Sequence, residues 1–106
     1  MTNFYARHIN MLKALSDETR LKIVHLLTQK EMHANELLEC FSIAQPSLSY
    51  HMKILSEANI VKCERRATYA IYSIDHRLTD HIREFLGMLE SENHALSKRS
   101  VAEQYE

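Results

Sequence analysis

The sequence predicts a mainly helical α+β fold in which several helices carry a single β-hairpin. The chain has 106 residues with one glycine and one proline, so few residues interrupt its helices. Apolar residues recur at helical spacing along much of the chain, whereas residues 60–74 have the composition of strands. At this length we expect one domain at residues 1–91, followed by a polar, flexible tail at residues 92–106.

Two helices are expected before the first polar break. The first covers residues 3–15 and has one apolar side. Ser16 has the character of an N-cap for the second, because Asp17 and Glu18 follow it where the helix dipole favours anions. The second helix should run to about Thr28 and bury a broad apolar face.

A short third helix and a longer fourth helix follow the polar break at residues 29–31. The third is expected at about residues 34–41, and residues 42–44 then form a tight connection. The fourth begins around Pro46, because a first helical turn tolerates proline, and it ends near residues 58–59. Helix, short turn and helix together are the helix-turn-helix arrangement.

The fourth helix has one side suited to a core and one side suited to nucleic acid. Leu48, Met52 and Leu55 repeat at the spacing of a buried stripe. The outer side carries an amide, hydroxyls, a phenol, an imidazole and one cation, which are groups that read base edges and hold phosphates. These outer residues are Gln45, Ser47, Ser49, Tyr50, His51 and Lys53. A polar helix face that meets only water is the alternative interpretation.

The predicted hairpin pairs residues 60–64 with residues 68–74. Arg65, Arg66 and Ala67 would form its tip, although no glycine marks a primed turn there. Two cations at a tip beside a reading helix suit contact with the phosphate backbone of DNA. A solvated arginine turn is the other interpretation.

Charge is distributed unevenly along the chain, although its net charge is only −1. Residues 42–74 carry four basic and two acidic residues, a net charge of +2. Residues 75–106 carry four basic and seven acidic residues, a net charge of −3. Positive charge therefore gathers around the fourth helix and the hairpin, which supports binding to nucleic acid.

A last helix is expected at residues 76–91, with an apolar stripe that is long for a helix covering one small domain. The stripe consists of Leu78, Ile82, Phe85, Leu86 and Leu89. We therefore expect a symmetric homodimer that forms through the N- and C-terminal helices, with ordinary packing inside one chain as the alternative. Gly87 would permit close approach of the partner helix.

Three blocks in this order resemble the ArsR/SmtB repressors over about residues 5–90. Residues 12–23, LKALSDETRLKI, are similar to the opening signature of that family, and residues 45–55, QPSLSYHMKIL, resemble its recognition helix. Residues 60–61 with the basic hairpin and Tyr72 resemble its wing. The resemblance implies a winged helix-turn-helix homodimer that represses transcription and releases its operator when an inducer binds.

The metal sites of the family are not reproduced in this sequence. His33 and Asn35 stand where the arsenic- and cadmium-type members carry a Cys-x-Cys pair, so a soft thiolate site is absent as usually built. Zinc- and cobalt-type members carry two metal-binding pairs on the last helix. Here the run that corresponds to the first pair is Asp75-His76-Arg77-Leu78, and Leu89 and Glu92 stand where the second pair would be, so that pattern is not met either. The inducer therefore stays open.

Weaker metal and redox sites remain among seven histidines and two cysteines. Two last helices paired antiparallel would bring together imidazoles and carboxylates for Zn²⁺ or Ni²⁺, and a solvated acidic face is the alternative. The ligands would be His76, Asp80, His81 and Glu84. A second combination joins His33 or Cys40 to His8. Cys40 and Cys63 would form a thiol switch, whereas a small buried hydrophobe is the simpler role for Cys40.

The sequence predicts a cytoplasmic protein without a membrane partner. Its N-terminus is not a signal peptide, and no apolar run approaches membrane-spanning length. Without an export signal, both cysteines should be reduced thiols.

We therefore expect a sequence-specific repressor on an inverted-repeat operator in double-stranded DNA. The residues expected to contact bases are Gln45, Ser49, Tyr50 and His51, and those expected to hold the backbone are Ser47, Lys53, Arg65 and Arg66. The alternatives are a winged helix that binds another protein, and a repressor that responds to thiol oxidation or a small organic ligand. No glycine-rich loop or nucleophile–base arrangement indicates an enzyme.

Overall fold

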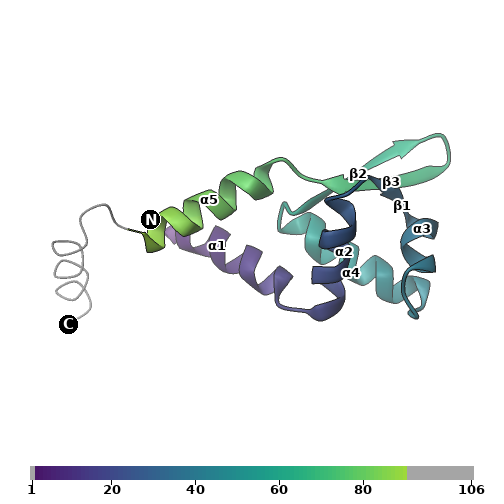
Figure 1. Ribbon diagram of the computed structural model, residues 1–106, viewed down its shortest axis with the longest axis horizontal. Coiled ribbons are helices and arrows are strands. Elements are labelled where there is room, and N and C mark those ends of the chain that lie inside the picture. The colour runs from purple at the N-terminus through teal and green to yellow at the C-terminus, as the bar shows by residue number, and fades with distance from the viewer. Residues whose placement is uncertain (1, 91–106) are drawn as a thin grey trace, which may run out of the picture.

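The computed structural model describes residues 2–90, and the tail predicted at residues 92–106 lies outside them. The elements are α1 (Thr2–Leu15), α2 (Glu18–Leu27), β1 (Met32–His33), α3 (Ala34–Glu39), α4 (Gln45–Glu57), β2 (Val61–Arg66), β3 (Tyr69–Ile74) and α5 (Arg77–Leu89). Helices α1 and α5 lie side by side as an arm at one end, and the other elements form a globular head (Figure 1). The mainly helical α+β fold with a hairpin is confirmed. No helix in the described part of the chain is long and apolar enough to cross a membrane.

The sheet has three strands rather than the predicted two. β1 pairs with β3 in an antiparallel ladder that places Met32 opposite Tyr72, and the strand order is β1-β3-β2. A strand of two residues is too short to produce an alternating pattern, so β1 could not be predicted from periodicity. The added strand ties the start of α3 to the wing.

The hairpin turn lies one residue beyond the predicted tip. β2 extends through Arg66, which is opposite Tyr69, so both arginines belong to the strand. Ala67 and Thr68 form the turn, and Ala67 adopts a positive φ of 55°. The prediction was wrong because no glycine marks the left-handed position that a two-residue turn requires.

Asp17, rather than the predicted Ser16, caps α2. Its Oδ2 accepts the Arg20 backbone N–H at 3.0 Å, whereas the Ser16 hydroxyl donates to the Leu12 carbonyl at 2.7 Å. The bond from the Arg20 amide also lowers the pKa of Asp17. Both residues suit a cap, and the carboxylate additionally gains from the positive end of the helix.

Most of the core lies in the head, between α2, α3, α4 and the sheet, and Met11 and Ala14 of α1 and Leu78 of α5 extend it into the arm. Helix α4 buries Leu48, Met52 and Leu55, as its spacing predicts. Asn59 then ends the helix with a positive φ of 60°, and the Ile60 N–H bonds to the Leu55 carbonyl at 3.0 Å. Leu55 is fully buried, so its replacement by alanine would cost about 2–5 kcal/mol. This packing fixes which side of α4 faces solvent.

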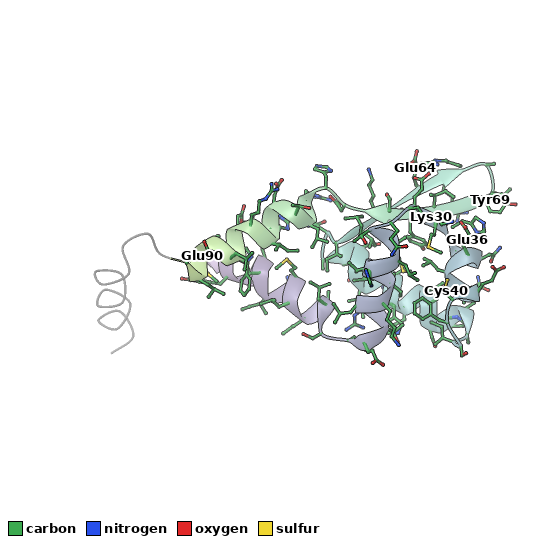
Figure 2. All side chains as sticks on the ribbon, in the orientation of Figure 1. Lys30, Glu36, Cys40, Glu64, Tyr69 and Glu90 are labelled. Atoms are coloured by element: carbon green, nitrogen blue, oxygen red, sulfur yellow. The ribbon has the colours of Figure 1, made fainter. Side chains whose placement is uncertain are left out.

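The arm leaves apolar side chains exposed. These residues are Tyr5, Ile9 and Leu12 on α1, and Leu86, Met88 and Leu89 on α5. The two helices are joined by an ion pair of 2.8 Å between Arg7 and Glu84. Figure 2 shows Glu90 at the end of this arm and Tyr69, Glu36 and Cys40 at the opposite end of the molecule.

Candidate nucleic-acid interface

The outer side of α4 is exposed along its length. Because Leu48, Met52 and Leu55 anchor one side in the core, the polar side chains opposite them project into solvent. Tyr50 is 62% exposed, whereas a large aromatic ring is usually more deeply buried. The other exposed outer residues are Gln45, Ser47, Ser49 and Lys53, and His51 is half-buried.

The first turn of α4 is also available to a ligand. Ala44 is the N-cap and makes no side-chain hydrogen bond to the helix. The positive end of a 13-residue helix is therefore not neutralised by a capping side chain. Such an end favours an anion, and in a nucleic-acid-binding protein that anion is a phosphate.

Arg20 fixes the tautomer of His51. Its Nη1 lies 3.2 Å from His51 Nδ1, and its Nε donates to the Ala14 carbonyl at 2.6 Å. A guanidinium can only donate, so Nδ1 must accept and the ring must carry its proton on Nε2. His51 therefore offers an N–H donor from the outer side of α4. Sequence reasoning gave Arg20 no role, because nothing in the chain order links it to a residue 31 positions away.

The two arginines of the hairpin have different surroundings. Arg65 shares a strand face with Cys63 and Val61, and this face turns toward α3 and α4. Its only recorded side-chain bond within residues 2–90 is a long one, 3.4 Å, to the Thr68 carbonyl. A hollow of about 300 Å³ separates the hairpin from the helices, and Gln45, Ser49 and Arg65 all line it. The structure thus brings these three predicted contacts together.

Arg66 lies on the opposite strand face and is held by carboxylates. It donates to both oxygens of Glu31, at 2.6 and 3.0 Å, and to Glu64 at 3.1 Å. These bonds raise the pKa of Arg66 and lower the pKa of Glu31. The structure therefore does not present Arg66 alongside Arg65, and contact with a phosphate would require Arg66 to leave its partners.

The predicted metal ligands do not form a site within one chain. Among residues 2–90 no three His, Cys, Asp or Glu side chains gather closely enough to hold a metal ion. Those predicted on the last helix are His76, Asp80, His81 and Glu84, and Glu84 is already paired with Arg7. The site across two chains stays a prediction.

The combination of His8 with His33 or Cys40 does not form within one chain, because α1 carries His8 in the arm whereas His33 and Cys40 lie in the head. His8 is 2% exposed, and neither ring nitrogen has a hydrogen-bond partner in the described part of the chain. His33 instead caps α3. Its Nδ1 accepts the Glu36 N–H at 3.3 Å while its own N–H donates to the Glu36 carboxylate at 3.0 Å.

Both cysteines are free and exposed. Cys40 ends α3 and donates to the Glu36 carbonyl at 3.4 Å, so its interpretation as a buried hydrophobe is wrong. Cys40 is the C-cap of α3, which ends at Glu39, two residues earlier than predicted. Cys63 lies opposite Tyr72, and burial followed by this thiol raises the pKa of Tyr72. A thiol switch stays a prediction.

Comparison with known proteins identifies the family. Residues 15–64 match a family model described as a helix-turn-helix domain. The arsenical resistance operon repressor of Staphylococcus xylosus is 32% identical over 97 residues, which cover 92% of this chain and 93% of that protein. The chain belongs to the ArsR/SmtB family.

Other members of the ArsR/SmtB family agree with this assignment. The transcriptional repressor SdpR of Bacillus subtilis is 39% identical over 66 residues, which cover 62% of this chain and 73% of that protein. HlyU from Vibrio cholerae superposes with a TM-score of 0.69 at 27% identity, covering 84% of this chain and 97% of HlyU. The chain is thus an ArsR-type transcriptional repressor, and this family consists of DNA-binding regulators rather than enzymes.

Proposed function

We propose that this ArsR-type repressor binds an inverted-repeat operator as a homodimer, with α4 in the major groove and the hairpin along the backbone. The observation that carries the proposal is the outer side of α4, where exposed groups able to donate and accept surround a fixed N–H donor on His51. The anchored apolar stripe of α4 holds these groups in one orientation.

The contacts divide into two kinds. Base edges would be read by Gln45, Ser49, Tyr50 and His51, and phosphates would be held by Ser47, Lys53, Arg65 and Arg66. Of the two arginines, Arg65 would contribute more to phosphate binding, because Arg66 already donates hydrogen bonds to Glu31 and Glu64. Phosphate contacts set the register of the protein on DNA, and base contacts set its preference for one sequence.

The exposed apolar residues of the arm support a homodimer. A folded chain rarely leaves large apolar patches uncovered. Ile9 and Leu12 lie one turn apart on α1, Leu86 and Leu89 lie one turn apart on α5, and all four are exposed. Pairing the arms of two chains about a two-fold axis would cover them. It would also give two copies of α4, as a palindromic operator requires.

A fluorescence-anisotropy titration on DNA from upstream of the gene itself tests the proposal. Replacing Ser49 and Tyr50 together by alanine should reduce the preference for operator over random DNA by about tenfold or more, while non-specific affinity changes little. Lys22→Gln, a change at an exposed cation on α2, serves as the control. Undiminished operator preference in the double variant would show that the assigned reading face is wrong. Binding that ignores both salt and sequence would favour a protein-binding winged helix.

The same titration, repeated with effectors, addresses release. Dissociation by Zn²⁺ or Ni²⁺ supports the site across two chains at His76, Asp80, His81 and Glu84. Dissociation by a thiol oxidant supports Cys40 and Cys63, whose thiols are exposed. Indifference to all of these points to an organic effector.

A further inference from the structure

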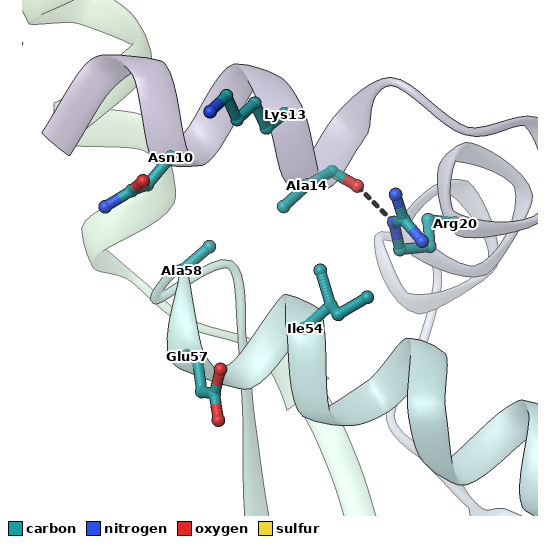
Figure 3. Close-up of a pocket in the computed structure, with 7 residues that line it drawn as sticks. All are labelled: Asn10, Lys13, Ala14, Arg20, Ile54, Glu57 and Ala58. Carbon is teal, nitrogen blue, oxygen red and sulfur yellow. Dashed lines mark hydrogen bonds between the residues drawn. The ribbon is translucent and has the colours of Figure 1, made fainter. Parts of the chain in front are cut away.

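A cavity of about 390 Å³ lies outside the proposed DNA-binding surface, between the arm and the head. It is partly open to solvent, and its walls come from α1, the start of α2 and the last turns of α4 (Figure 3). The lining residues are Asn10, Lys13, Ala14, Arg20, Ile54, Glu57 and Ala58. The volume lies within the range of sites that bind small molecules.

Arg20 forms one end of this cavity. Among residues 2–90 its side chain bonds only to the Ala14 carbonyl and His51 Nδ1, and no carboxylate there lies within 4.0 Å of its guanidinium. Asp17 accepts the Arg20 backbone N–H rather than its side chain, and the charge of Arg20 adds to the lowering of the Asp17 pKa. No bond is recorded for Nη2 in residues 2–90, so a half-buried cation keeps donors unused. This is a place where an anion would be bound.

The centre of the cavity is apolar. Ala14 on α1 faces Ile54 and Ala58 on α4, and Figure 3 shows these three side chains directed toward one another from the two helices. Lys13 and Glu57 extend away from the centre in the same view. The cavity therefore combines a compact apolar body with one strong cationic group at its end.

We propose that the cavity binds a small organic monocarboxylate, with its carboxylate on the Arg20 guanidinium and its apolar part against Ala14, Ile54 and Ala58. Arg–carboxylate pairs form two parallel N–H···O bonds, which requires the guanidinium to present an edge. The free edge of Arg20 consists of the second N–H of Nη1 and an N–H of Nη2. Turning the guanidinium to align this edge with a carboxylate in the cavity would lengthen the 3.2 Å bond from Nη1 to His51, so His51 would lose the partner that fixes its tautomer.

The consequence for DNA rests on the proposed function. Without Arg20, the His51 ring is free to move its proton between Nδ1 and Nε2 and to rotate, and the ordered donor on α4 is lost. Occupation of the cavity should therefore weaken operator binding. By linkage, operator DNA should weaken carboxylate binding by the same factor.

Binding is tested first without DNA, by NMR on uniformly ¹⁵N-labelled protein titrated with benzoate and with hexanoate. Saturable shifts are expected at the amides of Ala14, Arg20, Ile54 and Ala58, with a change in the His51 ring nitrogen signals that reports its tautomer. Benzamide, which has the same ring without the charge, should bind roughly tenfold more weakly or not at all. Absence of saturable shifts with both acids, or equal binding of benzamide, would overturn the proposal.

Two variants separate the anion contact from the cavity itself. Arg20→Gln should raise the dissociation constant of benzoate at least tenfold, and Ala58→Leu should do so by filling the apolar centre while leaving Arg20 in place. Lys22→Gln on the same helix as Arg20 should leave it unchanged. Unchanged benzoate binding in a folded Ala58→Leu variant would also overturn the assignment.

Operator affinity is then measured at saturating benzoate. A loss of several-fold in wild type but not in Ala58→Leu supports the coupling through His51. Saturated protein with unchanged operator affinity would refute that coupling. Failure to bind any operator would refute the proposed function while leaving the NMR result intact.

Discussion

Replacing Glu31 by glutamine should strengthen DNA binding by releasing Arg66 toward the phosphate backbone. In the structure both Nη atoms of Arg66 bond to the Glu31 carboxylate, at 2.6 and 3.0 Å, and Glu64 adds a third contact at 3.1 Å. Because Arg66 lowers the pKa of Glu31, the carboxylate is fully charged near neutral pH. Glutamine keeps the size of the side chain and removes the charge, so Arg66 is left with one exposed partner.

The expected size follows from counterion release. One additional phosphate contact changes the slope of log affinity against log salt by about −0.9. Between 50 and 200 mM salt, Glu31→Gln should therefore lose roughly threefold more affinity than the wild type, and it should bind more tightly at the lower salt. The free energy of unfolding should change little, because the side chains of Arg66, Glu31 and Glu64 are 50%, 45% and 60% exposed and surface ion pairs contribute little.

Fluorescence anisotropy across a salt series measures this effect. Glu18→Gln removes an equally charged but distant side chain, which is 87% exposed on α2, and controls for the change in net charge. Adding Arg66→Gln to Glu31→Gln should restore the wild-type slope. Equal slopes in Glu31→Gln and wild type, or equal gains in Glu31→Gln and Glu18→Gln, would refute the role assigned to Arg66.

Three further outcomes are expected. Asp75→Asn should reduce the free energy of unfolding by about 1–2 kcal/mol near neutral pH, because Arg77 holds the pKa of Asp75 at about 2. In urea titrations the difference in unfolding free energy between wild type and variant should shrink as pH falls from about 4 through 2. A difference that does not depend on pH would contradict this. Ala67→Gly should raise the free energy of unfolding by about 0.5–1 kcal/mol, because glycine adopts the left-handed φ of 55° without strain. A lower melting temperature of the variant would show that the turn is not strained. Leu89→Asp should shift sedimentation toward monomer, whereas Leu21→Asp, at another leucine that is more than half exposed but lies outside the arm, should not. A stable dimer of the Leu89→Asp variant would exclude this surface.

The sequence predicted those features that depend on periodicity. The stripe of Leu48, Met52 and Leu55 was sufficient to place α4, its buried side and its outer side. Composition was likewise sufficient to place the two long strands. Each of these signals repeats over several residues, so a single misread position does not change the outcome.

Features that depend on a single residue, or on two residues far apart in the chain, could not be predicted from the sequence. Ser16 and Asp17 are both good caps, and only the fold shows which of them meets the Arg20 amide. The different surroundings of Arg65 and Arg66 follow from strand faces and from Glu31, which pairs with Arg66 from 35 positions away. The Arg20–His51 bond likewise joins α2 to α4, and no local pattern in the sequence predicts that contact.

The cap that His33 forms has a consequence for metal binding at the start of α3. The resemblance places His33 where a thiol of the arsenic-type members would fall, yet here its Nδ1 accepts the Glu36 N–H and its Nε2 lies 3.5 Å from the Glu36 carboxylate. A cation could bind Nδ1 only by displacing the Glu36 N–H from it. The side chain at this position therefore has a structural role, and replacing His33 by cysteine would remove the capping bond at the start of α3.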